Sequence, residues 1–252
     1  MNIDYPKPCD ISGLRILWQE AFGDTDEFLD NFFSVAYSPD RALCVKQDRQ
    51  VVGAMYWFEC ECRGIPTAYI YAVATAKEYR GKGICHQLMY QAHKILKSIG
   101  YRIAILVPSE KSLFDLYAKM GYSVCSNIHK WECAAKDLGV SVTEIDKDEY
   151  AYLRRQYLPE GGVIQERENI DFLVMQMNLY KGDGFVMAAK PHNGTLYCSE
   201  LLGDTDNVLG IAYALNCSKG VFRTSGGTTP FAMQIRLDKT SLPPTYFGLA
   251  FD

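Results

Sequence analysis

The stretch Arg-Gly-Lys-Gly at residues 80–83 separates two apolar segments of different period, and this junction constrains the fold more than any other part of the sequence. Residues 68–75 form a continuous apolar run, as in a buried strand, whereas residues 84–99 carry apolar side chains at helical spacing until Gly100. A helix that begins directly after a glycine turn presents unpaired backbone N–H groups, and these groups together with the helix dipole favour negative charge. The junction therefore predicts a strand, an anion-binding turn and a helix in that order.

The chemistry of this turn favours a diphosphate. No Gly-Lys-Ser or Gly-Lys-Thr occurs in the chain, which excludes a Walker loop, and His86 stands where a Rossmann turn needs its third glycine. Glycines allow a ligand to approach the backbone closely, and Arg80 and Lys82 add charge-assisted contacts. We expect a coenzyme that carries a pyrophosphate and a long arm.

The first half of the chain alternates helical and strand patterns. Helices are predicted at 11–22, within 24–37, at 84–99 and at 111–121, and strands at 42–48, 50–62, 68–75, 102–107, 122–126 and 129–134. A polar stretch at 136–150 then interrupts the pattern. Strands at 184–190, 194–203 and 230–237 and a helix at 206–216 follow it, with Asp206 as the expected cap. The sequence predicts an α+β protein of two domains, residues 1–138 and residues 139–252, and shows no internal repeat.

Composition restricts the possible partners. A net charge of −4, from 26 basic and 30 acidic residues, gives no basic surface for nucleic acid. Nine cysteines without a C-x-x-C pair indicate reduced thiols rather than a disulfide framework, and we assign no metal site. The first residues lack a signal-peptide pattern and no long apolar run occurs, so we expect a cytoplasmic protein without membrane contact. A homo-oligomer remains possible.

Two motifs together resemble the GNAT superfamily of N-acetyltransferases. The segment EYRGKGI at 78–84 is similar to the acetyl-CoA loop of that family, Q/R-x-x-G-x-G/A, with Glu78 in the first position. The segment SEKSLFDLYAKMGY at 109–122 resembles its later helix, which carries a tyrosine four residues before a glycine, here Tyr117 and Gly121. The order of predicted elements matches the family over about residues 10–134.

The resemblance implies a GNAT fold, in which helices flank a mixed, mostly antiparallel sheet. The same segments further resemble the Eis-type branch, whose members carry a degenerate second GNAT-like unit. By this resemblance the second, smaller α+β domain of this chain covers the acceptor site.

The resemblance also implies site residues. Acetyl-CoA is the expected co-substrate, and Tyr117 is the expected acid that protonates the departing thiolate. The predicted coenzyme contacts are Val73, Ala74 and Thr75 for the pantetheine arm, Arg80, Gly81, Lys82, Gly83, Ile84 and Cys85 for the pyrophosphate, and Ser112 and Phe114 on the Tyr117 helix.

No general base is obvious in the sequence. Thr67 occupies the position where some family members have a glutamate, so Glu59 on the neighbouring strand is a candidate, with Glu61 on the same face. The Eis-type resemblance implies a second candidate, a terminal carboxylate at Asp252. An acidic cluster in the first two helices suits a polyamine or aminoglycoside acceptor, or is a solvated face: Glu20, Asp24, Asp26, Glu27 and Asp30.

The predicted reaction is transfer of an acetyl group from acetyl-CoA to a primary amine of a small molecule or peptide. The amine attacks directly in a ternary complex, so Cys85 is not a nucleophile. Two alternatives stay open: a non-catalytic acetyl-CoA sensor or scaffold, and an acyltransferase that uses a longer acyl-CoA.

Overall fold

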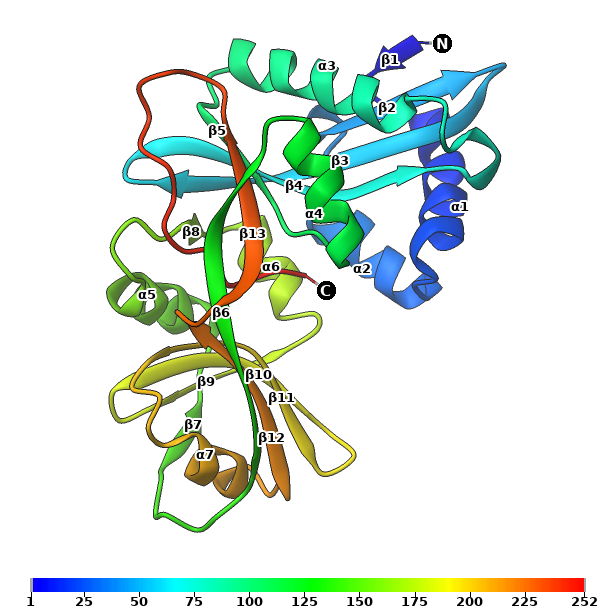
Figure 1. The fold of residues 1–252 in the computed structure, drawn as a ribbon. Helices are drawn as coiled ribbons and strands as arrows, with labels where there is room; N and C mark the ends of the chain where they lie inside the picture. Colours follow the sequence, from blue (N-terminus) through cyan, green and yellow to red (C-terminus); the bar gives the residue numbers. More distant parts are fainter. Residues whose placement is uncertain (1, 252) are drawn as a thin grey trace.

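A single mixed sheet runs through the whole computed structural model, which describes residues 2–251 (Figure 1). The strand order is β1-β2-β3-β4-β5-β13-β6-β12-β11-β10-β9-β7, and β8 pairs with β3 outside this path. Every pair is antiparallel except β4 with β5 and β11 with β12. This architecture confirms the predicted α+β class.

The elements of the first half follow the predicted order. They are β1 (Asn2–Asp4), α1 (Ile11–Phe22), α2 (Asp26–Val35), β2 (Ala42–Gln47), β3 (Gln50–Cys62), β4 (Ile65–Thr75), α3 (Ile84–Ser98), β5 (Ile103–Leu106), α4 (Lys111–Lys119) and β6 (Ser123–Ala134). Gly23 ends α1 in the left-handed region with a φ of 75°, and the Thr25 hydroxyl caps α2 by accepting from the N–H of Phe28. The two strands predicted at 122–126 and 129–134 are one strand, β6, because Asn127 and Ile128 between them also pair with neighbouring strands.

The second half contains the remaining elements. They are β7 (Val142–Glu144), α5 (Lys147–Tyr157), β8 (Ile164–Gln165), α6 (Glu168–Leu173), β9 (Asn178–Gly182), β10 (Phe185–His192), β11 (Thr195–Gly203), α7 (Val208–Ala214), β12 (Lys219–Ser225) and β13 (Thr229–Arg236). The cap of α7 is Asn207, which makes no side-chain cap bond, so the prediction of Asp206 as the cap is wrong.

Two strands join the halves. The long strand β6 pairs with β13 near its beginning and with β12 along the rest of its length. β13 returns from the second half and inserts between β5 and β6, which places residues 229–236 in the sheet of the first half (Figure 1). The predicted boundary at residue 138 therefore divides the sequence but not the sheet.

Element order repeats between the halves. Apart from the two-residue strand β8, the series β7, α5, α6, β9, β10, β11, α7, β12 has the order of β1, α1, α2, β2, β3, β4, α3, β5. In each half a helix connects the one parallel pair of strands, and the strand before that helix carries a register shift.

Apolar packing covers both faces of the sheet. α3 buries one side, including Leu88 and Leu96, on the face that carries Met55 and Trp57. α1 and α2 cover the opposite face, where Trp18 and Phe32 pack among the aromatic rings of β3 and β4. Within residues 2–251, no helix combines the length and the apolar character needed to span a membrane.

Candidate active site

The predicted glycine turn connects β4 to α3. Gly81 and Gly83 have φ values of 74° and 77°, and nothing lies within 4 Å of the position that a Cβ would take at either residue. Gly83 is the N-cap of α3, and its carbonyl accepts from the N–H of Gln87. The first N–H groups of α3 have no acceptor within the helix, and open space beside Gly81 and Gly83 leaves room for a ligand, as an anion cradle requires.

Two cations stand beside this cradle. Arg80 Nε donates to the Thr75 carbonyl at 3.0 Å, which fixes the guanidinium against the end of β4. Lys82 Nζ lies 4.8 Å from the centroid of the Tyr79 ring, and both cations are exposed. Of the remaining predicted contacts in this turn, Ile84 is buried in the core and Cys85 is half-buried.

β4 carries a bulge just before the turn. Its pairing with β3 shifts between Ala54↔Ala74 and Tyr56↔Tyr71, so β4 has one residue more than β3 in this interval. Ala72 absorbs the bulge with a φ of 48°, a strained value for a residue with a Cβ. A bulge leaves backbone groups without a ladder partner, and these groups are what a coenzyme arm needs.

β4 and β5 part beside this bulge. Their parallel pairing covers Thr67↔Ile103 to Tyr69↔Ile105 and stops there. A cavity of about 700 Å³ opens where the strands separate. It is lined by residues of both strands, of α1, α2 and α4, and of the C-terminal segment, residues 246–251. Val73 and Tyr117 both line this cavity, so the structure brings these two predicted residues together. Ala74 and Thr75 remain in the ladder with β3.

Tyr117 points from α4 into the core beside the cavity, and only 7% of it is exposed. Burial raises the pKa of its phenol, and the nearby Cys85 raises it further, so the hydroxyl keeps its proton at neutral pH. Its ring packs edge-on against Tyr122 at 5.8 Å. Phe114 is half-buried on the same helix, whereas Ser112 is exposed and its hydroxyl donates to the Glu110 carboxylate.

The C-terminal segment closes the cavity. Phe251 lines the cavity, and the centroid of its ring lies 4.8 Å from that of Phe58 and 5.1 Å from that of Phe172. Further back, the N–H of Phe247 donates to the Ser126 hydroxyl at 3.1 Å, and that hydroxyl donates to the Phe247 carbonyl at 3.0 Å. Asp252 lies outside the described residues, so its predicted role stays a prediction.

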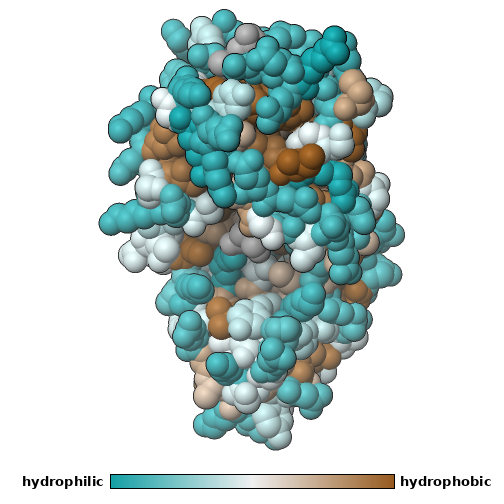
Figure 2. Space-filling model, turned by 90° about the vertical axis from the view of Figure 1, so that its right-hand side faces the viewer, coloured by the Kyte–Doolittle hydropathy of each residue, from teal (hydrophilic) through white to brown (hydrophobic). Residues whose placement is uncertain are grey.

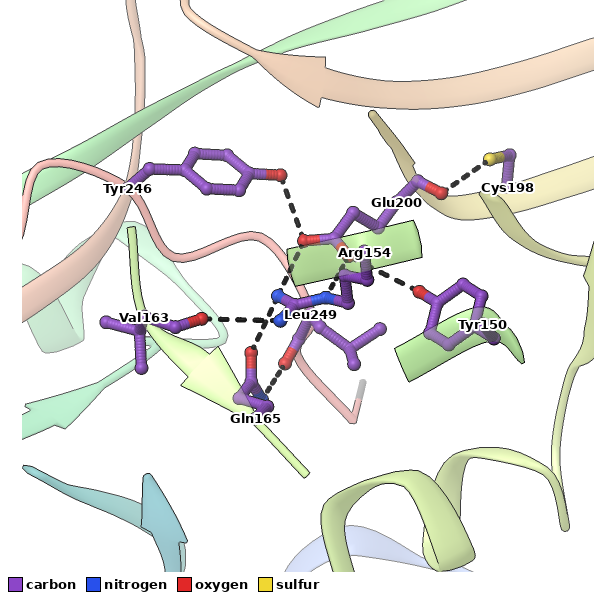
Figure 3. Close-up of polar contacts among 8 residues, drawn as sticks. All are labelled: Tyr150, Arg154, Val163, Gln165, Cys198, Glu200, Tyr246 and Leu249. Carbon is purple, nitrogen blue, oxygen red and sulfur yellow. Dashed lines mark hydrogen bonds and ion pairs between the residues drawn. The ribbon is translucent and has the colours of Figure 1, made fainter. Parts of the chain in front are cut away.

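A buried polar network in the second half holds the same segment (Figure 3). Gln165 Nε2 donates to the Leu249 carbonyl at 2.8 Å, and the Tyr246 hydroxyl donates to Glu200 at 3.1 Å. Arg154 joins both, because its guanidinium donates to Glu200 and to the side chain of Gln165. The second half thus helps to shape a cavity whose walls are mainly in the first half.

The structure does not bring Glu59 to this cavity. It pairs with Ala68, on the part of β4 that is still joined to β5, and lines a separate surface cavity. Its carboxylate is 3.5 Å from Arg167, with 44% of the side chain exposed. Thr67 is buried and donates to the Ile65 carbonyl, so it is not placed to act as a base.

The acidic cluster of α1 and α2 is mostly occupied outside the cavity. Glu20 accepts from the backbone N–H of Lys77 at 2.6 Å, and Asp26 and Asp30 pair with Arg15 at 3.5 and 2.8 Å. Of the five acidic residues, Asp24 alone lines the cavity. The prediction that the cluster as a whole binds the acceptor is therefore not supported.

Sequence reasoning missed the aromatic wall of the cavity. Trp18 and Phe28 appeared in the sequence as apolar positions of amphipathic helices, and Phe231 as part of a strand, so their patterns indicated only burial. The bulge at Ala72 has no sequence signal. Within residues 2–251, no three His, Cys, Asp or Glu side chains converge to hold a metal ion, and all nine cysteines are free thiols.

Comparisons with known proteins agree with this architecture. Residues 2–125 match the acetyltransferase (GNAT) domain. No curated protein is significantly similar in sequence. A GCN5-related N-acetyltransferase from Kribbella flavida superposes with a TM-score of 0.70 at 15% identity, over 92% of this chain and 70% of that one.

Two further structures are similar. A probable N-acyltransferase from Enterococcus faecalis, described as a conserved protein of unknown function, gives a TM-score of 0.72 at 16% identity, over 94% and 72% of the two chains. Eis1 from Mycobacterium abscessus gives 0.69 at 10% identity, over 94% and 74%. At these identities the likeness concerns the fold alone, and together with the family match over residues 2–125 it confirms the predicted GNAT fold.

Proposed function

We propose that this chain transfers the acetyl group of acetyl-CoA to a primary amine, by direct attack of the amine in a ternary complex. The observation that carries the proposal is one cavity, lined by both Val73 and Tyr117, at the point where β4 and β5 part beside the glycine turn. A thioester held there lies between backbone donors and a protonated phenol.

The glycine turn is suited to the diphosphate of the coenzyme. The backbone N–H groups at the start of α3 bind phosphate oxygens, and Arg80 and Lys82 add positive charge. The pantetheine arm then follows the bulged part of β4, where Ala72 and Val73 have no partner in the register with β3. This path leads from the turn to the parting of the strands, where the acetyl group sits.

The chemistry needs proton transfers at the amine, at the thiolate and at the phenol. An amine with a pKa of about 10.4 is only about one part in 10³ unprotonated at pH 7, so a base or water takes a proton before attack. The C–N bond then forms, the thioester carbonyl becomes an oxyanion, and a backbone N–H near Val73 stabilises it. The oxyanion collapses to the amide carbonyl, and the C–S bond breaks as Tyr117 donates its proton to the departing thiolate. The positively charged nitrogen then releases its extra proton to water, and the Tyr117 phenolate regains a proton from water. We assign no side chain to the base.

Calorimetry and a thiol-release assay test the proposal. The full chain is expected to bind acetyl-CoA and to release CoA thiol when an amine is added. Lys82→Ala is expected to weaken acetyl-CoA by about tenfold, a loss of about 1.4 kcal/mol, and to leave acetylpantetheine, which lacks the diphosphate, unchanged. Lys94→Ala is the matched control, because Lys94 lies on α3 over the Tyr90 ring and away from the turn.

Three outcomes separate the alternatives. Binding without thiol release from any amine would favour a sensor or scaffold. Faster turnover with propionyl-CoA or succinyl-CoA than with acetyl-CoA would favour the longer-acyl alternative. No heat with acetyl-CoA or CoA would refute the proposal.

The second half is proposed to be a second GNAT-derived unit that has lost coenzyme binding. Its element order supports this origin. The segment before α7 contains Asp204 and Asp206, which repel phosphate, where the segment before α3 has Arg80 and Lys82. Calorimetry is therefore expected to give one acetyl-CoA per chain.

A further inference from the structure

Aromatic rings form the wall of the cavity on the side of α1 and α2. They come from α1, α2, β4, β13 and the C-terminal segment: Trp18, Phe22, Phe28, Tyr71, Phe231 and Phe251. Ring centroids are 6.3 Å apart for Trp18 and Phe28, 5.7 Å for Trp18 and Tyr71, and 6.0 Å for Tyr71 and Phe251, so these four rings form one connected surface. Phe22 lies at the edge of this surface, with 46% of its area exposed. Figure 2 shows that hydrophobic patches interrupt the hydrophilic surface on one face of the molecule.

One carboxylate interrupts this wall. Among the described residues that line the cavity, Asp24 is the only charged one. Its Oδ2 accepts from Trp18 Nε1 at 2.8 Å, which fixes the carboxylate beside the indole ring. Its Oδ1 has no hydrogen bond within residues 2–251 and is free to accept from a ligand. Asp24 is itself only half-buried, so a ligand can approach it from solvent.

This arrangement suits a ligand with one cation and an apolar body. An ammonium group is stabilised by a carboxylate and by the faces of aromatic rings within about 6 Å. A second ammonium in the same cavity would meet no other carboxylate of the described lining, and an unpaired charge against aromatic rings is unfavourable. An aromatic or branched aliphatic body instead buries apolar surface against the rings.

We infer that the acceptor is a monoamine with an aromatic or branched apolar body, and that Asp24 recognises its ammonium form. This inference rests on the proposed function and narrows it. It replaces the expectation of a polyamine or aminoglycoside, because the other acids of α1 and α2 are paired with Arg15 or bound to the backbone of Lys77. The acetyl transfer itself follows the steps given above.

An acceptor panel tests the inference on the full chain at saturating acetyl-CoA. The probes are 2-phenylethylamine and 3-methylbutylamine against putrescine, spermidine and kanamycin, and the readout is kcat/KM from thiol release. The two apolar monoamines are expected to exceed each polycation by about tenfold or more, the ratio that corresponds to 1.4 kcal/mol. An equal or higher kcat/KM with a polycation would overturn the inference.

A variant pair separates recognition from folding. Asp24→Asn keeps an acceptor for Trp18 Nε1 but removes the charge, so KM for 2-phenylethylamine is expected to rise about tenfold while the Kd for acetyl-CoA stays unchanged. Asp26→Asn is the control, because Asp26 faces Arg15 and Gln19 outside the cavity. An unchanged KM in Asp24→Asn would overturn the role of Asp24.

The outcomes also distinguish this inference from the proposed function. If the chain binds acetyl-CoA and acetylates only polycations, the proposed function is supported and the inference about the acceptor is refuted. If the chain binds acetyl-CoA but acetylates neither class of amine, the inference is also refuted, since the two monoamine probes represent the acceptor class that it names. Absence of acetyl-CoA binding removes the proposed function, on which the inference rests.

Discussion

Arg154 Nε lies 2.6 Å from Glu200 Oε2, and the side chains of the two residues are only 2% and 1% exposed. A second contact, from Arg154 Nη2 to Glu200 Oε1 at 3.0 Å, makes the pair bidentate. Burial alone would lower the pKa of Arg154, but the Glu200 carboxylate raises it above its ordinary value, so the guanidinium keeps its charge. Through Tyr246 and Gln165 this pair holds the C-terminal segment that reaches the cavity (Figure 3).

We expect Glu200→Gln to destabilise the protein strongly. The substitution keeps the shape of the side chain but leaves the Arg154 guanidinium buried without its anion, which costs about 3–5 kcal/mol. Urea unfolding followed by circular dichroism measures the effect. Glu166→Gln is the matched control, because its pair with Arg155 is exposed by 54% and 38%, and we expect a change of about 0–1 kcal/mol. Similar losses in the two variants would contradict the structural role given to the buried pair.

Removing both charges is expected to be milder than removing one. The double variant Arg154→Met with Glu200→Met places apolar side chains of similar volume in the same site, and such replacements are often neutral in stability. The double variant also removes the acceptor of the Tyr246 hydroxyl, which helps to hold the C-terminal segment. We therefore expect kcat for acetyl transfer to fall even where the free energy of unfolding is nearly unchanged. Measuring the free energy of unfolding and kcat on the same samples separates the two effects.

Tyr117→Phe is expected to lower kcat and to leave acetyl-CoA affinity unchanged. The phenol supplies a proton only when the C–S bond breaks, and positioned acids of this kind contribute about 10²–10⁴-fold to rate. Steady-state thiol release and calorimetry give kcat and Kd. Tyr90→Phe on the exposed side of α3 is the control, since 57% of Tyr90 is accessible to solvent. An unchanged kcat in Tyr117→Phe would mean that this ring only packs.

Gly83→Ala is expected to weaken acetyl-CoA binding more than it weakens the fold. The φ of 77° disfavours any residue with a Cβ, by roughly 1–2 kcal/mol, although no atom lies within 4 Å of the added carbon. The same carbon stands beside the predicted diphosphate, so the Kd is expected to rise by about tenfold. Gly64→Ala provides the control, because Gly64 has a φ of 74° and equally open surroundings in the β3–β4 turn. An equal effect of the two variants on Kd would argue against the cradle.

His93 predicts a pH dependence of stability. Burial lowers its pKa from 6.5 to about 4, and its Nε2 lies 2.8 Å from the Tyr122 hydroxyl. Between these two values the unfolded chain binds more protons than the folded chain, so the free energy of unfolding rises as the pH increases from 4 to 6.5 and is constant above. The contribution is on the order of 3 kcal/mol.

The measurement is chemical denaturation at several pH values from 4.5 to 8. His93→Gln preserves a partner for the Tyr122 hydroxyl and is expected to reduce the slope below pH 6.5. His86→Gln, at an exposed position of the same helix, is expected to leave the slope unchanged. A slope in His93→Gln equal to that of the unmodified chain would contradict the assignment.

The sequence by itself determined the local features of this protein. The order strand, glycine turn, helix is encoded within residues 68–99, and the structure has it as β4, the turn and α3. The sequence also predicted Tyr117 as a candidate residue, because its helix and Gly121 form a contiguous motif. Such features depend on backbone propensities and on periods of a few residues, which a single sequence displays.

The cavity that these local features surround follows only from the tertiary structure. The insertion of β13 between β5 and β6, the approach of Phe251 to Phe58 and the separation of Glu59 from Tyr117 all depend on contacts between distant segments. The element order repeats between the halves although the sequence shows no repeat. Many different apolar sequences satisfy the same strand and helix patterns, and register and long-range packing choose among them only when the whole chain has folded.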